Sequence, residues 1–119
     1  MKREYLDEMA NMLQEFGGFY TVDDILQAIN EGQMQSFVEN DSWAVTQIND
    51  FPRRRAVEIV VLVGDKADIP ALNTQVETFA RDVGATLLMA AGRNGFKDVA
   101  PALGWTQMNM NFVREVSGT

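Results

Sequence analysis

The chain has 119 residues, of which 46% are hydrophobic and 23% are charged, a composition typical of a globular domain. It contains no cysteine and no histidine, which excludes disulfides, thiol nucleophiles and imidazole acid–base catalysis, and we expect no metal site. The formal net charge is −7, whereas proteins that neutralise nucleic-acid phosphates are usually basic. Direct nucleic-acid binding is therefore not expected.

Membrane insertion and secretion are not predicted either. No run approaches the roughly 18 apolar residues that a membrane-spanning helix needs. The first residues lead into an acidic amphipathic segment and not into the apolar core of a signal peptide.

Two amphipathic helices are predicted at the start of the chain. The first covers residues 2–16 and ends at Gly17 and Gly18. The second covers residues 22–30, because Thr21 followed three residues later by Asp24 is a capping-box pattern. The apolar stripe of the first helix consists of Tyr5, Leu6, Met9, Met12, Leu13 and Phe16.

Three antiparallel strands are predicted next, over residues 33–39, 42–50 and 56–63. Asn40 and Asp41 form a two-residue tip of the kind that tolerates positive φ. The strand over 56–63 is almost continuously apolar and β-branched, so we expect both of its faces to be covered.

A helix over residues 68–83 and a strand over 85–91 complete a βαβ unit, which makes strands 56–63 and 85–91 parallel. A short helix over 96–103 and a last strand over 105–116 are predicted to follow, the latter because apolar and polar residues alternate along it. The chain is therefore predicted to be one α/β domain over residues 1–119. It should have a mixed sheet and helices on both faces, with residues 1–17 as an additional N-terminal helix.

This order of elements resembles the GNAT superfamily of N-acetyltransferases. Leu103, Gly104 and Trp105 are similar to the Leu-Gly-Phe with which the last helix of these proteins ends before the final strands. The resemblance implies two parallel strands, here 56–63 and 85–91, that separate at their C-terminal ends. The pantetheine arm of acyl-CoA enters that gap in GNAT enzymes.

The segment after the central strand departs from the family pattern. GNAT enzymes have a glycine-rich loop there, whose backbone N–H groups hold the pyrophosphate of acyl-CoA. This chain has only Gly64, followed by Asp65, Lys66 and Ala67, and Ala100 stands where a catalytic Tyr is frequent. If the chain is an enzyme, the resemblance assigns residues 64–67 to acetyl-CoA and Glu58 to the general base that acts through water.

The turn over residues 92–95 and the pattern after it are also similar to small GNAT-like proteins of tailed bacteriophages, many of which lack the CoA loop. We therefore predict a non-catalytic protein without a cofactor that acts through protein–protein contacts. Its expected partners are phage structural proteins, and its expected location is the virion or the host cytoplasm. The expected contact residues are Tyr5, Met9, Met12, Phe16, Arg53, Arg54 and Arg55.

Two alternatives remain. In the first, the chain is an N-acetyltransferase that uses acetyl-CoA with an atypical phosphate loop. In the second, it is an acidic regulatory protein that mimics nucleic acid through groups such as Asp23 and Asp24. If the cofactor has been lost, side chains from residues 64–69 and 94–96 are expected to close the gap between strands 56–63 and 85–91. Unpaired strand amides and an apolar void would both be unfavourable.

Overall fold

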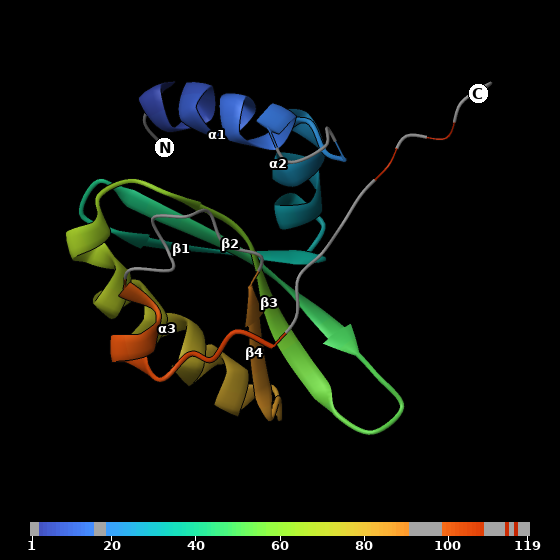
Figure 1. Ribbon diagram of the computed structural model, residues 1–119. Coiled ribbons are helices and arrows are strands. Elements are labelled where there is room, and N and C mark those ends of the chain that lie inside the picture. Colours follow the sequence, from blue (N-terminus) through green and yellow to red (C-terminus); the bar gives the residue numbers. More distant parts are fainter. Residues whose placement is uncertain (1–2, 16–18, 91–98, 109–113, 115, 117–119) are drawn as a thin grey trace.

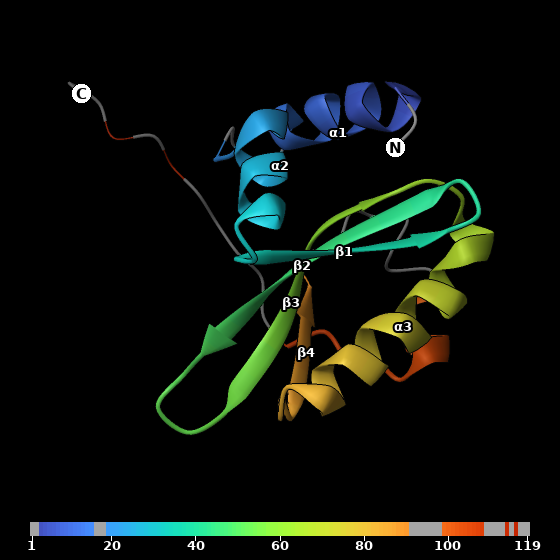
Figure 2. The same cartoon turned by 180° about the vertical axis from the view of Figure 1, so that it is seen from behind.

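A mixed four-stranded sheet with the order β1-β2-β3-β4 forms the centre of the protein (Figure 1). The computed structural model describes residues 3–15, 19–90, 99–108, 114 and 116. Helices α1 and α2 lie on one face of the sheet and α3 lies on the other (Figures 1 and 2). The elements are α1 (Arg3–Glu15), α2 (Val22–Asn30), β1 (Met34–Glu39), β2 (Ser42–Asp50), β3 (Arg55–Val63), α3 (Ile69–Asp82) and β4 (Leu87–Ala90).

The strand directions and helix ends follow from the local sequence. β1, β2 and β3 are antiparallel and β4 is parallel to β3, as the βαβ pattern predicts. Asn40 has φ 49°, the conformation expected at the two-residue tip between β1 and β2. The predicted capping box is also present, because Asp24 N donates to Thr21 Oγ1 (3.2 Å) and Thr21 N donates to Asp24 Oδ2 (2.9 Å). The predicted α/β fold is confirmed.

A β-bulge in β3 determines which residues reach each helical layer. Val45 pairs with Val61 and Thr46 pairs with Ile59, which leaves Val60 as an extra residue in β3. A bulge shifts the alternation of side chains along a strand. Before the bulge Val57 therefore packs on the α3 side, and after it Val61 packs on the side of α1 and α2.

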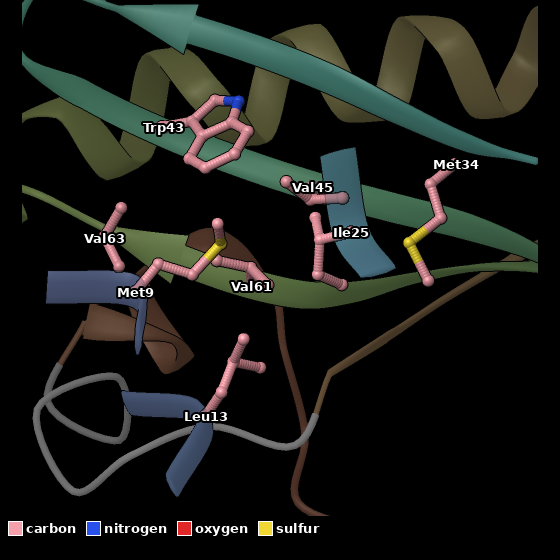
Figure 3. Packing of buried hydrophobic residues seen from close by; sticks show 8 residues of the cluster. All are labelled: Met9, Leu13, Ile25, Met34, Trp43, Val45, Val61 and Val63. Atoms are coloured by element: carbon pink, nitrogen blue, oxygen red, sulfur yellow. The ribbon is translucent and has the colours of Figure 1, made fainter. Parts of the chain in front are cut away.

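The larger hydrophobic core lies between the sheet and the first two helices. Met9 and Leu13 of α1 and Ile25 of α2 pack against side chains of the strands (Figure 3). The strand residues of this cluster are Met34, Trp43, Val45, Val61 and Val63. Met9 was expected to contact a partner, but it is fully buried, because α1 covers the sheet face that Trp43 occupies.

The other N-terminal residues expected to contact a partner cannot be placed. Phe16 and the side chains of Tyr5 and Met12 lie outside the residues that the structure describes. They stay a prediction.

The C-terminal part differs from the prediction. Residues 105–108, 114 and 116 of the predicted last strand are not in a strand. Trp105 Nε1 donates to Asn73 Oδ1 of α3 (2.8 Å), which holds the start of this segment against the helix. Of the predicted helix over 96–103, the described part has Val99 in an α-helical conformation, a turn at Ala100 and a 3-10 helix over Pro101–Leu103. The α-helical hydrogen bonds do not continue through Pro101, because proline has no N–H to donate. Residues 96–98 lie outside the described ranges.

Within the described ranges, the helices are too short or too polar to cross a membrane.

Candidate functional site

The loop between β3 and α3 is the place where the family resemblance predicts phosphate binding. Three of its backbone N–H groups, those of Asp65, Ala67 and Asp68, are bound within the chain. Asp65 N donates to Ser42 Oγ (2.8 Å), and Ala67 N donates to the Asp65 carboxylate (2.9 Å). Asp68 N donates to the carbonyl oxygen of Asp65 (3.0 Å). Three amides that could converge on a phosphate are therefore already used to hold the loop.

A buried polar network fixes the same loop to the tip between β1 and β2. Ser42 Oγ donates to Asp68 Oδ2 (2.5 Å), and Asn40 Nδ2 donates to Asp68 Oδ1 (2.8 Å). Ser42 and Asp68 are both buried, at 1% and 9% exposure. Two hydrogen bonds lower the pKa of Asp68, the larger effect coming from Ser42 and the smaller from Asn40. The Asp68 carboxylate is therefore charged at neutral pH. We name residues Asn40, Ser42, Asp65 and Asp68 the Ser42 network.

Gly64 is required by close packing in this network. Its φ is 124°, a backbone conformation that favours glycine. A Cβ atom at this position would lie 2.2 Å from Ser42 Oγ and 2.6 Å from Ser42 Cα. The one glycine of the loop thus has a structural reason that does not involve a phosphate group.

The structure describes β4 only where it is paired with β3, next to the gap that the family resemblance predicts. The two strands pair from Ala56 with Leu87 to Ile59 with Ala90, and the described pairing ends there, next to the bulge at Val60. Between the later part of β3 and α3 lies a cavity of about 10 Å³, room for about one water molecule. It is lined by Ala44, Ile59, Leu62, Ile69, Leu72, Asn73 and Val76. No residue of β4 lines this cavity, so it is not the gap between β3 and β4. The closing of that gap by residues 64–69 and 94–96 stays a prediction, because residues 94–96 lie outside the described part of the chain.

Glu58 is half-buried on β3, and its carboxylate is bound by two amides of β2. Gln47 Nε2 (3.1 Å) and Asn49 Nδ2 (2.7 Å) both donate to Glu58 Oε1. Gln47 also lines a hollow of about 470 Å³ beside α2, together with Phe19, Tyr20, Asp24, Ala28, Gln33 and Met34. A carboxylate at this position can accept a proton through water, but it lies in β3 before the bulge, whereas residues 64–67 follow the end of that strand.

Two of the three arginines expected to contact a partner are bound within the chain. Arg55 pairs with Asp50 (2.6 and 3.3 Å), which raises its pKa, and donates to Val83 O (2.8 Å). Arg54 donates to Thr86 Oγ1 (3.1 Å) and to Thr86 O (2.8 Å). These side chains join the β2–β3 turn to the turn before β4. Arg53 is exposed, and no bond of its side chain occurs among the described residues.

Sequence reasoning missed the residues that hold the candidate site together. Ser42 and Asp68 are 26 positions apart and belong to different elements, so no local motif joins them. Gln47 and Asn49 are two residues apart on one strand face, and this pattern could have predicted that they bind an acceptor such as Glu58.

The sequence matches no family model and no curated protein. The fold, in contrast, is similar to solved structures. An acetyltransferase from Trypanosoma brucei has a TM-score of 0.66 at 13% identity, covering 98% of this chain and 96% of that chain. A putative acetyl transferase from Pyrococcus furiosus has a TM-score of 0.64 at 15% identity, covering 96% and 95%. The aminoglycoside N-acetyltransferase AAC(6')-Iy, solved in complex with CoA, has a TM-score of 0.63 at 13% identity, covering 98% and 91%.

These likenesses show that the chain has a GNAT acetyltransferase-like fold. At identities of 11–16% they define the fold alone.

Proposed function

We propose that this protein is a non-catalytic GNAT-fold protein that acts through contacts with other proteins. The observation that supports this proposal is the internal use of the loop amides of Asp65, Ala67 and Asp68. A pyrophosphate in this position would have to break those bonds, and it would meet two carboxylates, those of Asp65 and Asp68. The buried Asp68 has a lowered pKa and stays charged, so it repels a phosphate group.

The setting of those contacts is part of the same proposal. The turn over residues 92–95 and the sequence Leu103, Gly104, Trp105 resemble small GNAT-like proteins of tailed bacteriophages. We therefore propose a role in a virion or in its assembly, with phage structural proteins as partners. Arg53, Tyr5, Met12 and Phe16 remain the proposed contact residues.

Calorimetric titration with acetyl-CoA tests the proposal. We expect no heat of binding at millimolar ligand and no ligand-dependent rise in the melting temperature, since a ligand that binds only the folded state must raise it. A micromolar dissociation constant, or a melting temperature that rises with acetyl-CoA, would contradict the loss of the cofactor site.

An N-acetyltransferase activity is the second candidate. It is favoured by the solved structures of similar fold, several of which are acetyltransferases, one of them in complex with CoA. Glu58 is the candidate general base, because its carboxylate is held in place by Gln47 and Asn49.

A thiol-release assay with acetyl-CoA and a panel of amines decides between the two candidates. The chain has no cysteine, so a thiol-reactive dye reports released CoA without a protein background. Amine-dependent release that is lost in Glu58→Gln would establish the enzyme. That variant is a matched control, because the amide keeps an oxygen that accepts the bonds from Gln47 and Asn49.

A further inference from the structure

The turn between β2 and β3 projects from the sheet on the side away from α1 and α2 (Figures 1 and 2). β1 begins at Met34, which pairs with Gln47, so the last three residues of β2 extend past the start of β1. All six residues from Asp50 to Arg55 are exposed, and Phe51 is 47% exposed. This turn is a surface of its own, which we name the hairpin tip and define as residues 50–55.

The hairpin tip is basic in an acidic chain. It contains three arginines and one aspartate, a net charge of +2, whereas the whole chain has a net charge of −7. Asp50 pairs with Arg55, but Arg54 donates to neutral oxygen atoms of Thr86, which do not compensate its charge. Arg53 is exposed, and no bond of its side chain occurs among the described residues. The tip therefore presents two positive charges beside an exposed phenylalanine.

The conformation of the tip is fixed within the chain. Phe51 N donates to Arg54 O across the turn (3.0 Å), and the ring of Pro52 restricts its own φ. The Arg54 side chain is held by its bonds to Thr86 (3.1 and 2.8 Å). A preorganised surface loses less conformational entropy on binding, and arginine and aromatic side chains are enriched at protein interfaces. These features are typical of a contact with another protein.

We propose that the hairpin tip binds an acidic segment of a partner protein, with a carboxylate against Arg53 and an apolar side chain against Phe51. This inference rests on the proposed function, because it assigns a partner chemistry to the contact residue Arg53. Carboxylates match the geometry of guanidinium groups. The rest of the chain has an excess of acids and repels such a segment, so the charge pattern directs it to the tip.

A partner protein is favoured over a nucleic acid or a membrane by the number of charges at the tip. Nucleic acids are bound through many phosphate contacts, and anionic membranes through clusters of about 4–8 basic residues. Two uncompensated arginines in a chain with a net charge of −7 supply neither.

Fluorescence anisotropy with labelled peptides tests this inference. The probe is a short peptide in which glutamate alternates with leucine, and the matched peptide has serine in place of leucine. We expect the wild-type chain to bind the glutamate–leucine peptide more tightly, because serine makes no apolar contact with Phe51. Binding should weaken as the salt concentration rises, because the charges at the tip are exposed.

Three variants locate the contact. Arg53→Glu should weaken binding of the glutamate–leucine peptide about tenfold, since it replaces attraction by repulsion at the tip. Phe51→Ser should remove the preference for this peptide over the serine peptide. Lys66→Glu is the matched control, because Lys66 is exposed at the other end of the β2–β3 ladder and the substitution changes the net charge by the same amount. It should keep the wild-type affinity.

Four results would overturn the inference. The first is no binding of either peptide, and the second is equal weakening by Arg53→Glu and Lys66→Glu, which would mean that net charge alone decides binding. The third is tighter binding of single-stranded DNA or of phosphatidylserine vesicles than of the peptide. The fourth is a dimer mass in light scattering that Arg53→Glu reduces to the mass of one chain, which would make the acidic partner a second copy.

The titration with acetyl-CoA separates this inference from the proposed function. Binding of acetyl-CoA would contradict the non-catalytic function whatever the peptides do. A chain that binds neither acetyl-CoA nor the peptides would contradict only the inference about the hairpin tip.

Discussion

The two ends of the β2–β3 ladder are held together in different ways. At one end, where Ser42 begins β2 and Val63 ends β3, a buried hydroxyl and a buried carboxylate fix the loop to α3. At the other end, Asp50 and Arg55 join the strands through an ion pair in which 42% of the arginine side chain and 64% of the aspartate side chain are exposed. Burial and close packing stabilise the first end, and solvent-exposed charges stabilise the second.

This difference bears on function because the first end is the one where GNAT enzymes hold phosphate. A phosphate loop needs backbone amides that are available to a ligand. Here the Ser42 hydroxyl accepts a bond from the amide of Asp65 and donates one to the carboxylate of Asp68. The same groups cannot both stabilise the fold and receive a ligand. The comparison therefore predicts large losses of stability for substitutions at the Ser42 network and small losses at the Asp50–Arg55 end.

Gly64→Ala should show the largest effect. The new methyl group would overlap Ser42 Oγ at 2.2 Å, and the residue would keep a φ of 124°. Overpacking and the unfavourable backbone conformation each contribute about 1–3 kcal/mol, so we expect a loss of about 3 kcal/mol in the free energy of unfolding, measured by urea denaturation.

Gly84→Ala is the matched control for this substitution. Gly84 also has positive φ, at 76°, but no atom lies within 4 Å of an added Cβ. It should therefore lose only the backbone contribution, about 1 kcal/mol. Equal losses for the two variants would show that the contact between Gly64 and Ser42 is not tight.

Ser42→Ala should have the second largest effect. The Ser42 hydroxyl accepts from Asp65 N and donates to Asp68 Oδ2, and its removal leaves both groups without this partner. A polar group that is buried without its hydrogen bond costs about 1–3 kcal/mol, so we expect a loss of about 2 kcal/mol. Thr74→Ala removes an exposed hydroxyl that is bonded to Pro70 O and should change stability by less than about 0.5 kcal/mol. A similar loss in both variants would argue against the network.

Asp68→Asn should make stability less dependent on pH. The pKa of Asp68 is lowered in the folded protein, first by Ser42 and then by Asn40. The carboxylate therefore stabilises the fold above its ordinary pKa of about 4, and this contribution is lost as the pH falls through the folded-state value. The variant should have a lower urea midpoint at pH 7 and a smaller decrease of that midpoint in acid. Asp7→Asn, on the exposed side of α1, should keep the wild-type pH profile.

The sequence predicted those parts of this comparison that depend on neighbouring residues. Asn40 and Asp41 indicated the two-residue tip, and Thr21 with Asp24 indicated the start of α2, because both patterns are formed within four residues. The parallel pairing of β3 and β4 followed from the βαβ order, which topology restricts strongly.

Long-range contacts decided the rest. The bulge at Val60 lies in a run of apolar residues where no periodicity marks an extra residue, yet it determines the layer that each later side chain faces. Alternation predicted a strand over residues 105–116, but the described residues of this range are not in a strand, and Trp105 is bound to Asn73, 32 positions away. Similarly, Arg53, Arg54 and Arg55 were expected to contact a partner, but Arg54 donates to Thr86, 32 positions away.

Arg55→Ala is expected to have the smallest effect. It removes the ion pair with Asp50 and the bond to Val83 O, but all of these groups are exposed and compete with water. Exposed ion pairs contribute about 0–1 kcal/mol, so the free energy of unfolding should fall by less than about 1 kcal/mol, and the loss should shrink further at high salt because the pair is screened. Arg53→Ala removes the same charge from the neighbouring turn and is the control, since no bond of the Arg53 side chain occurs among the described residues. Two results would contradict the difference between the two ends. One is a loss of stability from Arg55→Ala that equals the loss from Ser42→Ala, and the other is a loss that persists in 1 M salt. Either result would mean that the Asp50–Arg55 end stabilises the fold as much as the Ser42 network does.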